Sequence, residues 1–295
     1  MRRILACLIV LSFTVCFLAA CKNDRTRKIV IGSKFFTEQV VLAELLAQHI
    51  EARTGIPVER KTNLGGTLLI HKAMLAGDLD LYVEYTGTAL TAVLGEAPKG
   101  SAKATFDRVK EQYEQRFGMD VTEPLGFENT FAMVVRADDA EKLHLKNMSD
   151  LATVAPKWHA AVGYEFLERP DGFKGWSALY GLKFAETPRV MDLGLLYRAL
   201  TQHQADIVAG NSTDGLIVTL RLVPLNDDKH YFPPYDAVPI VRHTTLEKYP
   251  EIRTALQELG GKISAEEMRQ MNAAVDADQR DVKEVVREFR LRKGL

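Results

Sequence analysis

Strands and helices alternate along the first part of the chain, and this alternation limits its fold more than any other feature. Residues 29–31 form a short aliphatic run, and residues 37–50 follow with apolar residues at helical spacing and Thr37 as the predicted N-cap. A strand over 58–61 and a helix over 68–76 repeat the unit. Because parallel strands need a crossover between them, the pattern predicts an α/β fold with open, helix-flanked sheets.

The segment 77–90, GDLDLYVEYTGTAL, supplies the next strand and the first candidate binding residue. Leu79, Leu81 and Val83 alternate with acidic or aromatic neighbours, which is typical of a strand with one buried face. The run ends in Tyr85 and a Thr-Gly-Thr turn. Open α/β sheets bind ligands at the carboxyl ends of their strands. We therefore expect Tyr85 to form one wall of a pocket.

The alternation restarts in the middle of the chain, which predicts a second lobe. A helix is expected over 106–117, a long strand over 125–136, strands over 160–164, 189–191 and 206–209, and helices near 176–180 and over 195–202. Residues 232–242 are then predicted to be a return crossing, because Pro233 and Pro234 fix an extended path.

Helices complete the chain, the first of them opened by a capping box of Ser264 and Glu267. Val282, Val285 and Phe289 are expected to pack these helices back on the first lobe. The predicted lobes are residues 28–130 with 234–295 and residues 131–233. Two lobes joined by two crossings can close on a ligand at the hinge.

The first twenty residues have the pattern of an export signal, with Arg2 and Arg3 before an apolar run that ends in Leu-Ala-Ala-Cys21. All three cysteines lie in this segment, so a chain cleaved before Cys21 keeps no thiol nucleophile beyond that residue. Residues 21–27 are predicted to be a charged tether. The formal charge of −1 at pH 7 argues against nucleic acid as a partner.

Several short sequence blocks, taken together and in their order along the chain, indicate a protein family. They are Gly32-Ser33-Lys34, Asn63 to Thr67, Glu84-Tyr85-Thr86-Gly87-Thr88, Asn129-Thr130, Arg169 with Asp171-Gly172, Ser212 to Gly215, and Pro233-Pro234-Tyr235. Together with the Leu-Ala-Ala-Cys sequence, they resemble the substrate-binding lipoproteins of glycine betaine/choline/carnitine (osmoprotectant) ABC importers.

This resemblance implies a two-lobed periplasmic-binding-protein fold of type II. It implies a monomer that is exported, carries lipid on Cys21 and is anchored to the cell envelope. Such a protein hands a quaternary amine to a membrane permease driven by a separate ATPase, and it needs no cofactor.

A trimethylammonium group explains why aromatic residues matter here. It carries a full charge but no N–H, so aromatic faces bind it at low desolvation cost, with roughly 0.5 to 2 kcal/mol from each ring. Carried over by position, the family's aromatic cage corresponds to Tyr85, Phe131, Asn211 and Tyr235. Asn211 replaces an aromatic residue and is also a candidate helix cap. The sequence therefore predicts a cage of three rings, with weaker betaine binding or a different ligand.

The other end of the ligand, expected to be a carboxylate, needs hydrogen-bond donors. The candidates are Lys34, Gln39, Thr67 with the amides of Gly65 and Gly66, Arg169, Ser212 and Thr213. Two of them have alternative roles, since Lys34 can pair with Glu38 and Arg169 can form a salt bridge within the protein.

Other function classes stay open at this point. One alternative is a binding or sensor protein of the same fold for a different betaine-like amine such as ergothioneine, outside osmoprotection. An exported enzyme is the other. Against it, the seven histidines include no pair at i, i+4 that would suggest a metal site, and no G-x-S-x-G nucleophile motif is present.

Overall fold

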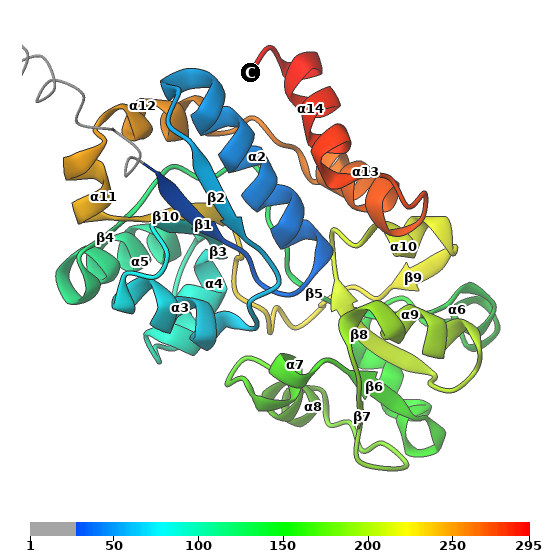
Figure 1. Ribbon diagram of the computed structural model, residues 1–295. Coiled ribbons are helices and arrows are strands. Elements are labelled where there is room, and N and C mark those ends of the chain that lie inside the picture. Colours follow the sequence, from blue (N-terminus) through cyan, green and yellow to red (C-terminus); the bar gives the residue numbers. More distant parts are fainter. Residues whose placement is uncertain (1–27) are drawn as a thin grey trace, which may run out of the picture.

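The computed structural model describes residues 28–295, so the predicted signal segment 1–20, the tether 21–27 and Cys21 lie outside the described residues. Two five-stranded sheets form the framework (Figure 1). The first has the order β2-β1-β3-β10-β4. Its strands are β1 (Ile29–Gly32), β2 (Val58–Lys61), β3 (Leu81–Tyr85), β4 (Met119–Val121) and β10 (Ala237–Arg242).

The second sheet repeats this arrangement, in the order β7-β6-β8-β5-β9. Its strands are β5 (Phe131–Arg136), β6 (Ala160–Val162), β7 (Arg189–Val190), β8 (Ile207–Asn211) and β9 (Leu222–Pro224). In each sheet three parallel strands are followed by one strand that runs antiparallel to both of its neighbours. The prediction of two open α/β sheets is therefore confirmed.

Helices cover both faces of each sheet. Around the first sheet they are α2 (Thr37–Thr54), α3 (Thr67–Ala76), α4 (Thr86–Thr88), the π-helix η1 (Ala89–Val93), α5 (Ala102–Phe117), α11 (His243–Lys248), α12 (Glu251–Glu258), α13 (Ala265–Asp276) and α14 (Val282–Lys293). Around the second they are α6 (Ala137–Leu143), the short 3₁₀ helices η2 (Met148–Thr153) and η3 (Ala155–Lys157), α7 (Tyr164–Glu168), α8 (Phe173–Tyr180), α9 (Leu193–Thr201) and α10 (Gly215–Thr219). Among the helices of residues 28–295, none combines the length and apolar character that a membrane crossing requires.

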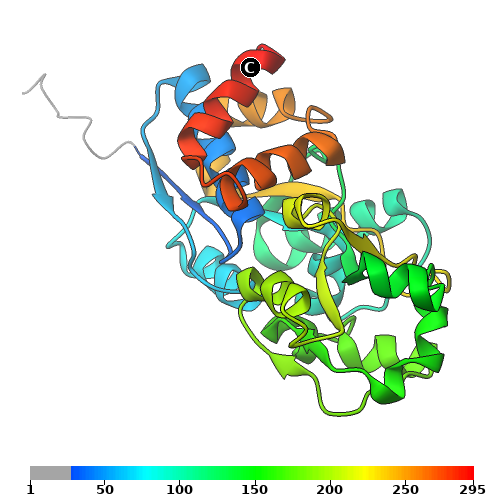
Figure 2. The ribbon, with the colours of Figure 1, turned by 90° about the vertical axis from the view of Figure 1, so that its right-hand side faces the viewer.

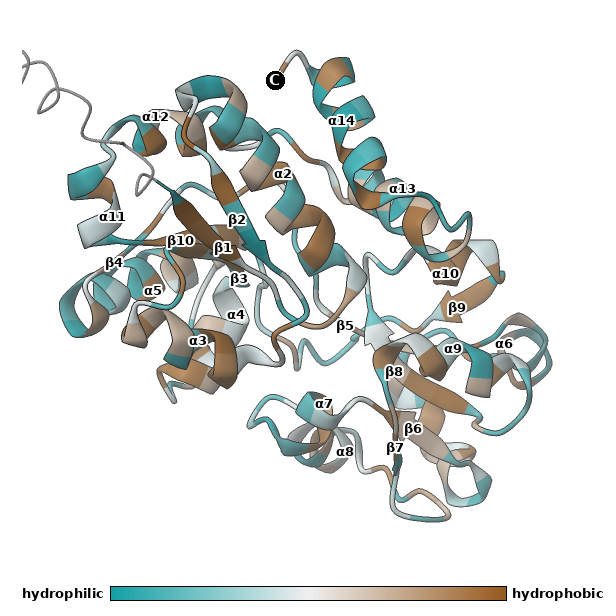
Figure 3. Ribbon diagram, viewed as in Figure 1, coloured by the Kyte–Doolittle hydropathy of each residue, from teal (hydrophilic) through white to brown (hydrophobic). Residues whose placement is uncertain are grey.

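Strand β3 is buried on both faces, so the prediction of one exposed face is wrong. All five of its residues are buried, Tyr82 as fully as Leu81. The cause is that separate hydrophobic clusters lie on the two sides of the first sheet. In Figure 3 the central strands β1 and β8 are mostly brown, as expected for strands covered by helices.

Two segments, 122–130 and 225–236, cross between the sheets. They run together, since an isolated bridge pairs Glu128 with Asp236 and the amide of Asn129 donates to the carbonyl of Tyr235 at 3.1 Å. This paired crossing explains why the predicted strand over 125–136 is wrong in its first half. The strand begins only at Phe131. The lobe boundaries given above stay a prediction.

The ends of the chain meet on the first sheet. Val285, Val286 and Phe289 of α14 are buried in the cluster that holds α2, as predicted. The capping box of Ser264 and Glu267 is confirmed. Thr37, however, is not the N-cap of α2, because Phe36 takes that position and the Thr37 hydroxyl donates instead to Asp276 Oδ1 at 2.5 Å.

Helix α13 packs on both halves of the molecule, against α2 and against α10 (Figure 2). The contact with α10 is close because it contains a glycine. A Cβ on Gly215 would lie 2.4 Å from the backbone nitrogen of Ala273. Real side chains do not approach a backbone this closely, so any residue larger than glycine at this position would have to push the two helices apart.

Gly215→Ala should therefore lower the free energy of unfolding by about 1–3 kcal/mol, because overpacking forces α10 away from α13. Urea denaturation measures the effect. Gly194→Ala is the matched control, since a Cβ there meets nothing within 4 Å and alanine favours a helix. Equal stability of Gly215→Ala and the wild type would contradict the close packing.

Candidate functional site

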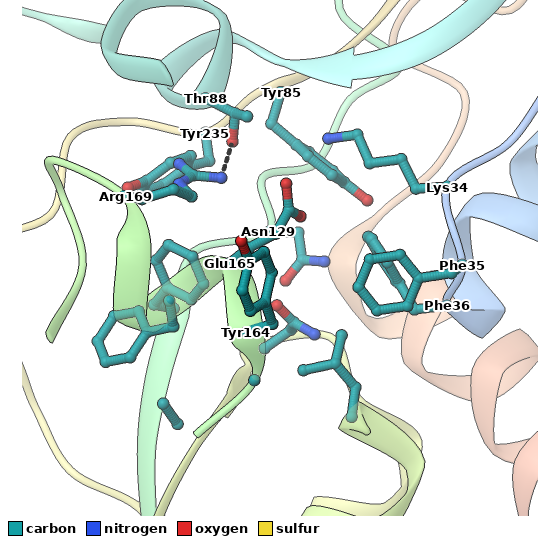
Figure 4. A pocket seen from close by; sticks show the side chains of 16 residues that line it. Lys34, Phe35, Phe36, Tyr85, Thr88, Asn129, Tyr164, Glu165, Arg169 and Tyr235 are labelled. Atoms are coloured by element: carbon teal, nitrogen blue, oxygen red, sulfur yellow. Dashed lines mark hydrogen bonds between the residues drawn. The ribbon is translucent and has the colours of Figure 1, made fainter. Parts of the chain in front are cut away.

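A cavity of about 50 Å³ lies where the two sheets face each other (Figure 4). Lys34 follows β1, Tyr85 ends β3, Tyr164 follows β6 and Asn211 ends β8. All four are therefore placed by the carboxyl ends of parallel strands, where open sheets bind ligands. The lining residues are Lys34, Phe35, Phe36, Tyr85, Thr88, Asn129, Phe131, Gly163, Tyr164, Glu165, Phe166, Arg169, Leu193, Ala209, Asn211 and Tyr235.

The structure brings six of the ten predicted ligand-binding residues to this cavity. They are Tyr85, Phe131, Asn211, Tyr235, Lys34 and Arg169. The other four are not among the lining residues. Gln39 is buried in α2, Ser212 bonds to the crossing at Thr130, Thr213 bonds to Glu38, and Thr67 lies at the start of α3.

Strand pairing places the predicted cage residues. Phe131 and Asn211 are directly opposite each other on β5 and β8. Tyr85 is opposite Ala237, and Tyr235 lies two residues before this partner. The rings of Phe131 and Tyr235 meet edge to face with their centroids 5.9 Å apart. Segments more than a hundred residues apart in the sequence thus present their rings to one space.

Four further rings line the cavity that sequence reasoning missed: Phe35, Phe36, Tyr164 and Phe166. Phe36 stacks on Tyr85 at a centroid distance of 6.5 Å. A usable signal was present, because both pairs lie at or just beyond the end of a predicted strand. The lining therefore has more than the three rings predicted, although Asn211 itself supplies none.

Two protein cations lie over the cavity rings. Lys34 Nζ is 5.2 Å from the centroid of Tyr85, and Arg169 Cζ is 5.0 Å from that of Phe131. Figure 4 shows Lys34 extending alongside Tyr85. These are distances at which an aromatic face attracts a cation. Tyr85 and Phe131 therefore each have a protein cation over one aromatic face.

Lys34 is paired with Glu84, so the alternative pairing with Glu38 is wrong. The two side chains are in direct contact, and both are buried. Glu84 lies on β3, the neighbour of β1 in the sheet. The charge of Lys34 is thus balanced inside the protein.

Arg169 forms a salt bridge inside the protein, as its alternative role predicted. Its Nε donates to Asp171 Oδ1 at 2.8 Å, and its Nη1 reaches the Thr88 hydroxyl at 3.1 Å. Asp171 also accepts from the hydroxyls of Thr91, at 2.9 Å, and Tyr235, at 2.6 Å. Burial acts to raise the pKa of Asp171, but the hydrogen bonds and charge of Arg169, together with the bonds from Tyr235 and Thr91, outweigh it and hold the pKa below its usual value.

Glu38 is the buried centre of a second network. Its Oε1 accepts from the Tyr85 hydroxyl at 2.6 Å and from Asn129 Nδ2 at 2.9 Å. Its Oε2 accepts from Thr213 and from Asn272 Nδ2, the latter at 3.0 Å. Burial raises the pKa of Glu38 although all four donors act to lower it. The carboxylate of Glu38 therefore links the two halves of the molecule, the crossing segment 122–130 and α13.

The start of α3, predicted to hold a ligand carboxylate, holds a protein carboxylate instead. The amide of Thr67 donates to Glu165 Oε1 at 2.7 Å. Glu165 belongs to α7 on the second sheet, and the same carboxylate lies where a Cβ on Gly66 would be. This bond joins the two halves at the rim of the cavity.

Asn211 is held by Asp214 through its backbone amide, which donates to Oδ2 at 2.9 Å. Tyr197 donates its hydroxyl to the same oxygen at 2.6 Å. Asp214 thus positions the residue that lies opposite Phe131. Burial raises the pKa of Asp214 from 3.8 to about 6, against the effect of these hydrogen bonds.

This raised pKa predicts how stability depends on pH. Between about pH 4 and pH 6 the folded protein binds a proton at Asp214 that the unfolded chain has lost, so Asp214 contributes a decline in stability as pH rises through this window. Asp214→Asn should remove that decline. The difference in unfolding free energy between variant and wild type should change by more than about 1 kcal/mol from pH 4 to 6. Urea denaturation at several pH values measures it, with Asp138→Asn on the exposed part of α6 as control. A pH-independent difference would contradict the assignment.

Comparison with known proteins adds a family match. Residues 27–291 match the model of the substrate-binding domain of ABC-type glycine betaine transport systems. The chain is 38% identical over 276 residues to a carnitine transport binding protein of Listeria monocytogenes, covering 93% of this chain and 89% of that protein. It is 34% identical over 270 residues to an ergothioneine transport permease/ergothioneine binding protein of Helicobacter pylori, covering 91% of this chain and 48% of that protein. A solved glycine betaine/carnitine/choline ABC transporter structure is 33% identical and superimposes with a TM-score of 0.76, over 90% of this chain and 98% of that one.

Proposed function

The chain belongs to the family of substrate-binding domains of ABC-type glycine betaine transport systems, and on this basis we propose that its cavity captures a small quaternary amine for delivery to a membrane permease. The observation that carries the proposal is the convergence of aromatic rings from both sheets on one buried space. Such faces attract a cation that has no hydrogen to donate.

The protein's own cations support this assignment. Lys34 and Arg169 each lie about 5 Å from a ring, at 5.2 and 5.0 Å, while each is bound to a carboxylate. A ligand cation entering the same space meets rings already oriented for positive charge. No bond of the ligand has to be broken for this function, and the energy for transport comes from the partner ATPase.

A second candidate is a larger betaine-like amine such as ergothioneine, favoured by the similarity to the Helicobacter pylori protein. A thermal-shift panel of glycine betaine, choline, carnitine and ergothioneine distinguishes the candidates, since a ligand that binds only the native state raises its melting temperature.

Phe131 is the ring best suited to a binding test. The hydroxyls of Tyr85 and Tyr235 donate to the buried carboxylates of Glu38 and Asp171, whereas Phe131 has no hydroxyl, so its replacement leaves no carboxylate without a donor. Phe131→Leu keeps an apolar side chain but removes the aromatic face, so the affinity for a quaternary amine should fall about tenfold. Isothermal titration calorimetry measures the loss. Phe184→Leu, in the core of the second sheet and away from the cavity, should bind like the wild type. Unchanged binding by Phe131→Leu would exclude the proposed cage.

We also propose that the protein is exported and anchored by lipid on Cys21, on the basis of the Leu-Ala-Ala-Cys sequence. Cys21→Ala should move the protein expressed in bacteria from the membrane pellet to the soluble fraction. Cys16→Ala is the control and should leave it in the pellet. Pelleting of Cys21→Ala to the same extent as the wild type would argue against the lipid.

A further inference from the structure

Two tyrosines that line the cavity, Tyr85 and Tyr235, both donate their hydroxyls to buried carboxylates (Figure 4). The Tyr85 hydroxyl reaches Glu38 Oε1 and the Tyr235 hydroxyl reaches Asp171 Oδ2, each at 2.6 Å. Hydrogen bonds to an ionised acceptor are stronger than those between neutral groups, and a low dielectric strengthens them further. Because the carboxylate attracts the phenolic proton, electron density is left on the oxygen and the ring. A tyrosine held in this way presents a more negative face to a cation.

The two carboxylates differ in how their charge is balanced. Asp171 is half of an ion pair, since it accepts from Arg169 Nε at 2.8 Å and from Nη2 at 2.5 Å. The hydrogen-bond donors to Glu38 among residues 28–295 are all uncharged. They are the side chains of Tyr85, Asn129, Thr213 and Asn272. Glu38 therefore has solvation inside the protein but no paired cation.

The donor set of Glu38 favours its charged form. The amide nitrogens of Asn129 and Asn272 donate to one oxygen each, and hydroxyls of Tyr85 and Thr213 add one bond to each. The orientation of Asn272 is fixed, because the same nitrogen donates to the Thr213 carbonyl at 3.0 Å. Several hydrogen bonds to one carboxylate stabilise its ionised state and oppose the effect of burial.

Glu38 acts on the cavity from behind its lining. It is 1% exposed and is not a lining residue, whereas Tyr85, which it binds, is one. The charged lining residues are two cations, Lys34 and Arg169, and one carboxylate, Glu165, so their sum is +1. The lining by itself therefore does not select a cationic ligand. A carboxylate behind a ring supplies negative potential there and loses no hydration when the ligand binds.

We propose that Glu38, ionised at neutral pH, acts through the Tyr85 ring as the counter-charge for the cationic head of the ligand. Tyr85 is then the strongest cation acceptor of the cavity, and Tyr235 contributes less because its carboxylate is already paired. The inference rests on the proposed function and deepens it, since it names the residue that sets the preference for charge over shape. Glu38 is a positioning residue, because it reaches the ligand only through Tyr85.

Matched ligands separate charge from shape. Choline and 3,3-dimethylbutanol have the same shape, but the second has a carbon atom in place of the ammonium nitrogen. Glycine betaine and 3,3-dimethylbutanoate form a second pair of this kind. The ratio of the two affinities within a pair reports the preference for the charge, and calorimetry measures it, with displacement titration for the weaker ligand. A purely structural role of Glu38 would weaken both ligands alike and leave this ratio unchanged.

Glu38→Gln keeps the size of the side chain and removes its charge, so the ratio should fall at least about fivefold. The variant has a way to satisfy its new amide, because Asn129 Oδ1 has no partner among the described residues and can turn to accept from it. Glu44→Gln is the matched control on the same helix α2. The Glu44 carboxylate binds Arg60 Nε at 3.0 Å and is not part of the cavity lining, so its ratio should equal that of the wild type. An unchanged ratio in a folded Glu38→Gln variant would overturn the proposal.

Tyr85→Phe keeps the ring and removes its bond to Glu38, which tests the same link without changing the carboxylate. It should lower the ratio about threefold or more, and by more than Tyr235→Phe does. An effect of Tyr235→Phe that equals or exceeds that of Tyr85→Phe would contradict the role of Glu38. If neither choline nor glycine betaine binds the wild type, this inference fails. If carnitine and ergothioneine do not bind either, the proposed function fails with it.

Discussion

The buried carboxylate of Glu38 is the interaction on which the rest of the structure depends. A carboxylate is costly to bury unless hydrogen bonds replace the water it loses. Here four donors do so, and they come from β3, a crossing, the second sheet and α13. Because each donor belongs to a different part of the chain, satisfying this one group fixes how those parts sit relative to one another. The ring of Tyr85 is held at the cavity by the same bonds.

Neither Lys34 nor Arg169 presents an unpaired positive charge to a ligand cation in the cavity, because each is paired with a carboxylate. Lys34 and Arg169 help to define its walls, yet both are neutralised in place. A buried pair of this kind adds little net stability, since desolvation offsets the attraction. At this site each pair instead helps to fix the position of a ring, because each cation lies over an aromatic face. Internal packing therefore uses the same aromatic faces to which we assign the ligand cation.

Local patterns predicted the two α/β sheets, the capping box of Ser264 and the arrival of Tyr85 at a strand end. They predicted the return crossing only in part, because residues 237–242 form strand β10. They could not predict partners that depend on strand order. Lys34 meets Glu84 only because β3 lies next to β1, and a sequence does not state which strands are neighbours. The donors to Glu38 are as far as 234 residues away, so no local spacing indicates them. Phe35 and Phe36 were different, since their place directly after a strand was visible and could have been used.

Helix α13 has a further consequence for how a ligand enters. It packs on α2 and α10 at once, so the two halves are fastened by the C-terminal region as well as by the two crossings. Separation on that side would break the close contact at Gly215 and the bonds to Asn272. Around α7, the halves are joined by the hydrogen bonds from Thr67 to Glu165, from Arg169 to Thr88 and from Thr91 to Asp171. Opening the cavity at α7 therefore requires breaking hydrogen bonds, whereas opening it at α13 would also pull apart two closely packed helices.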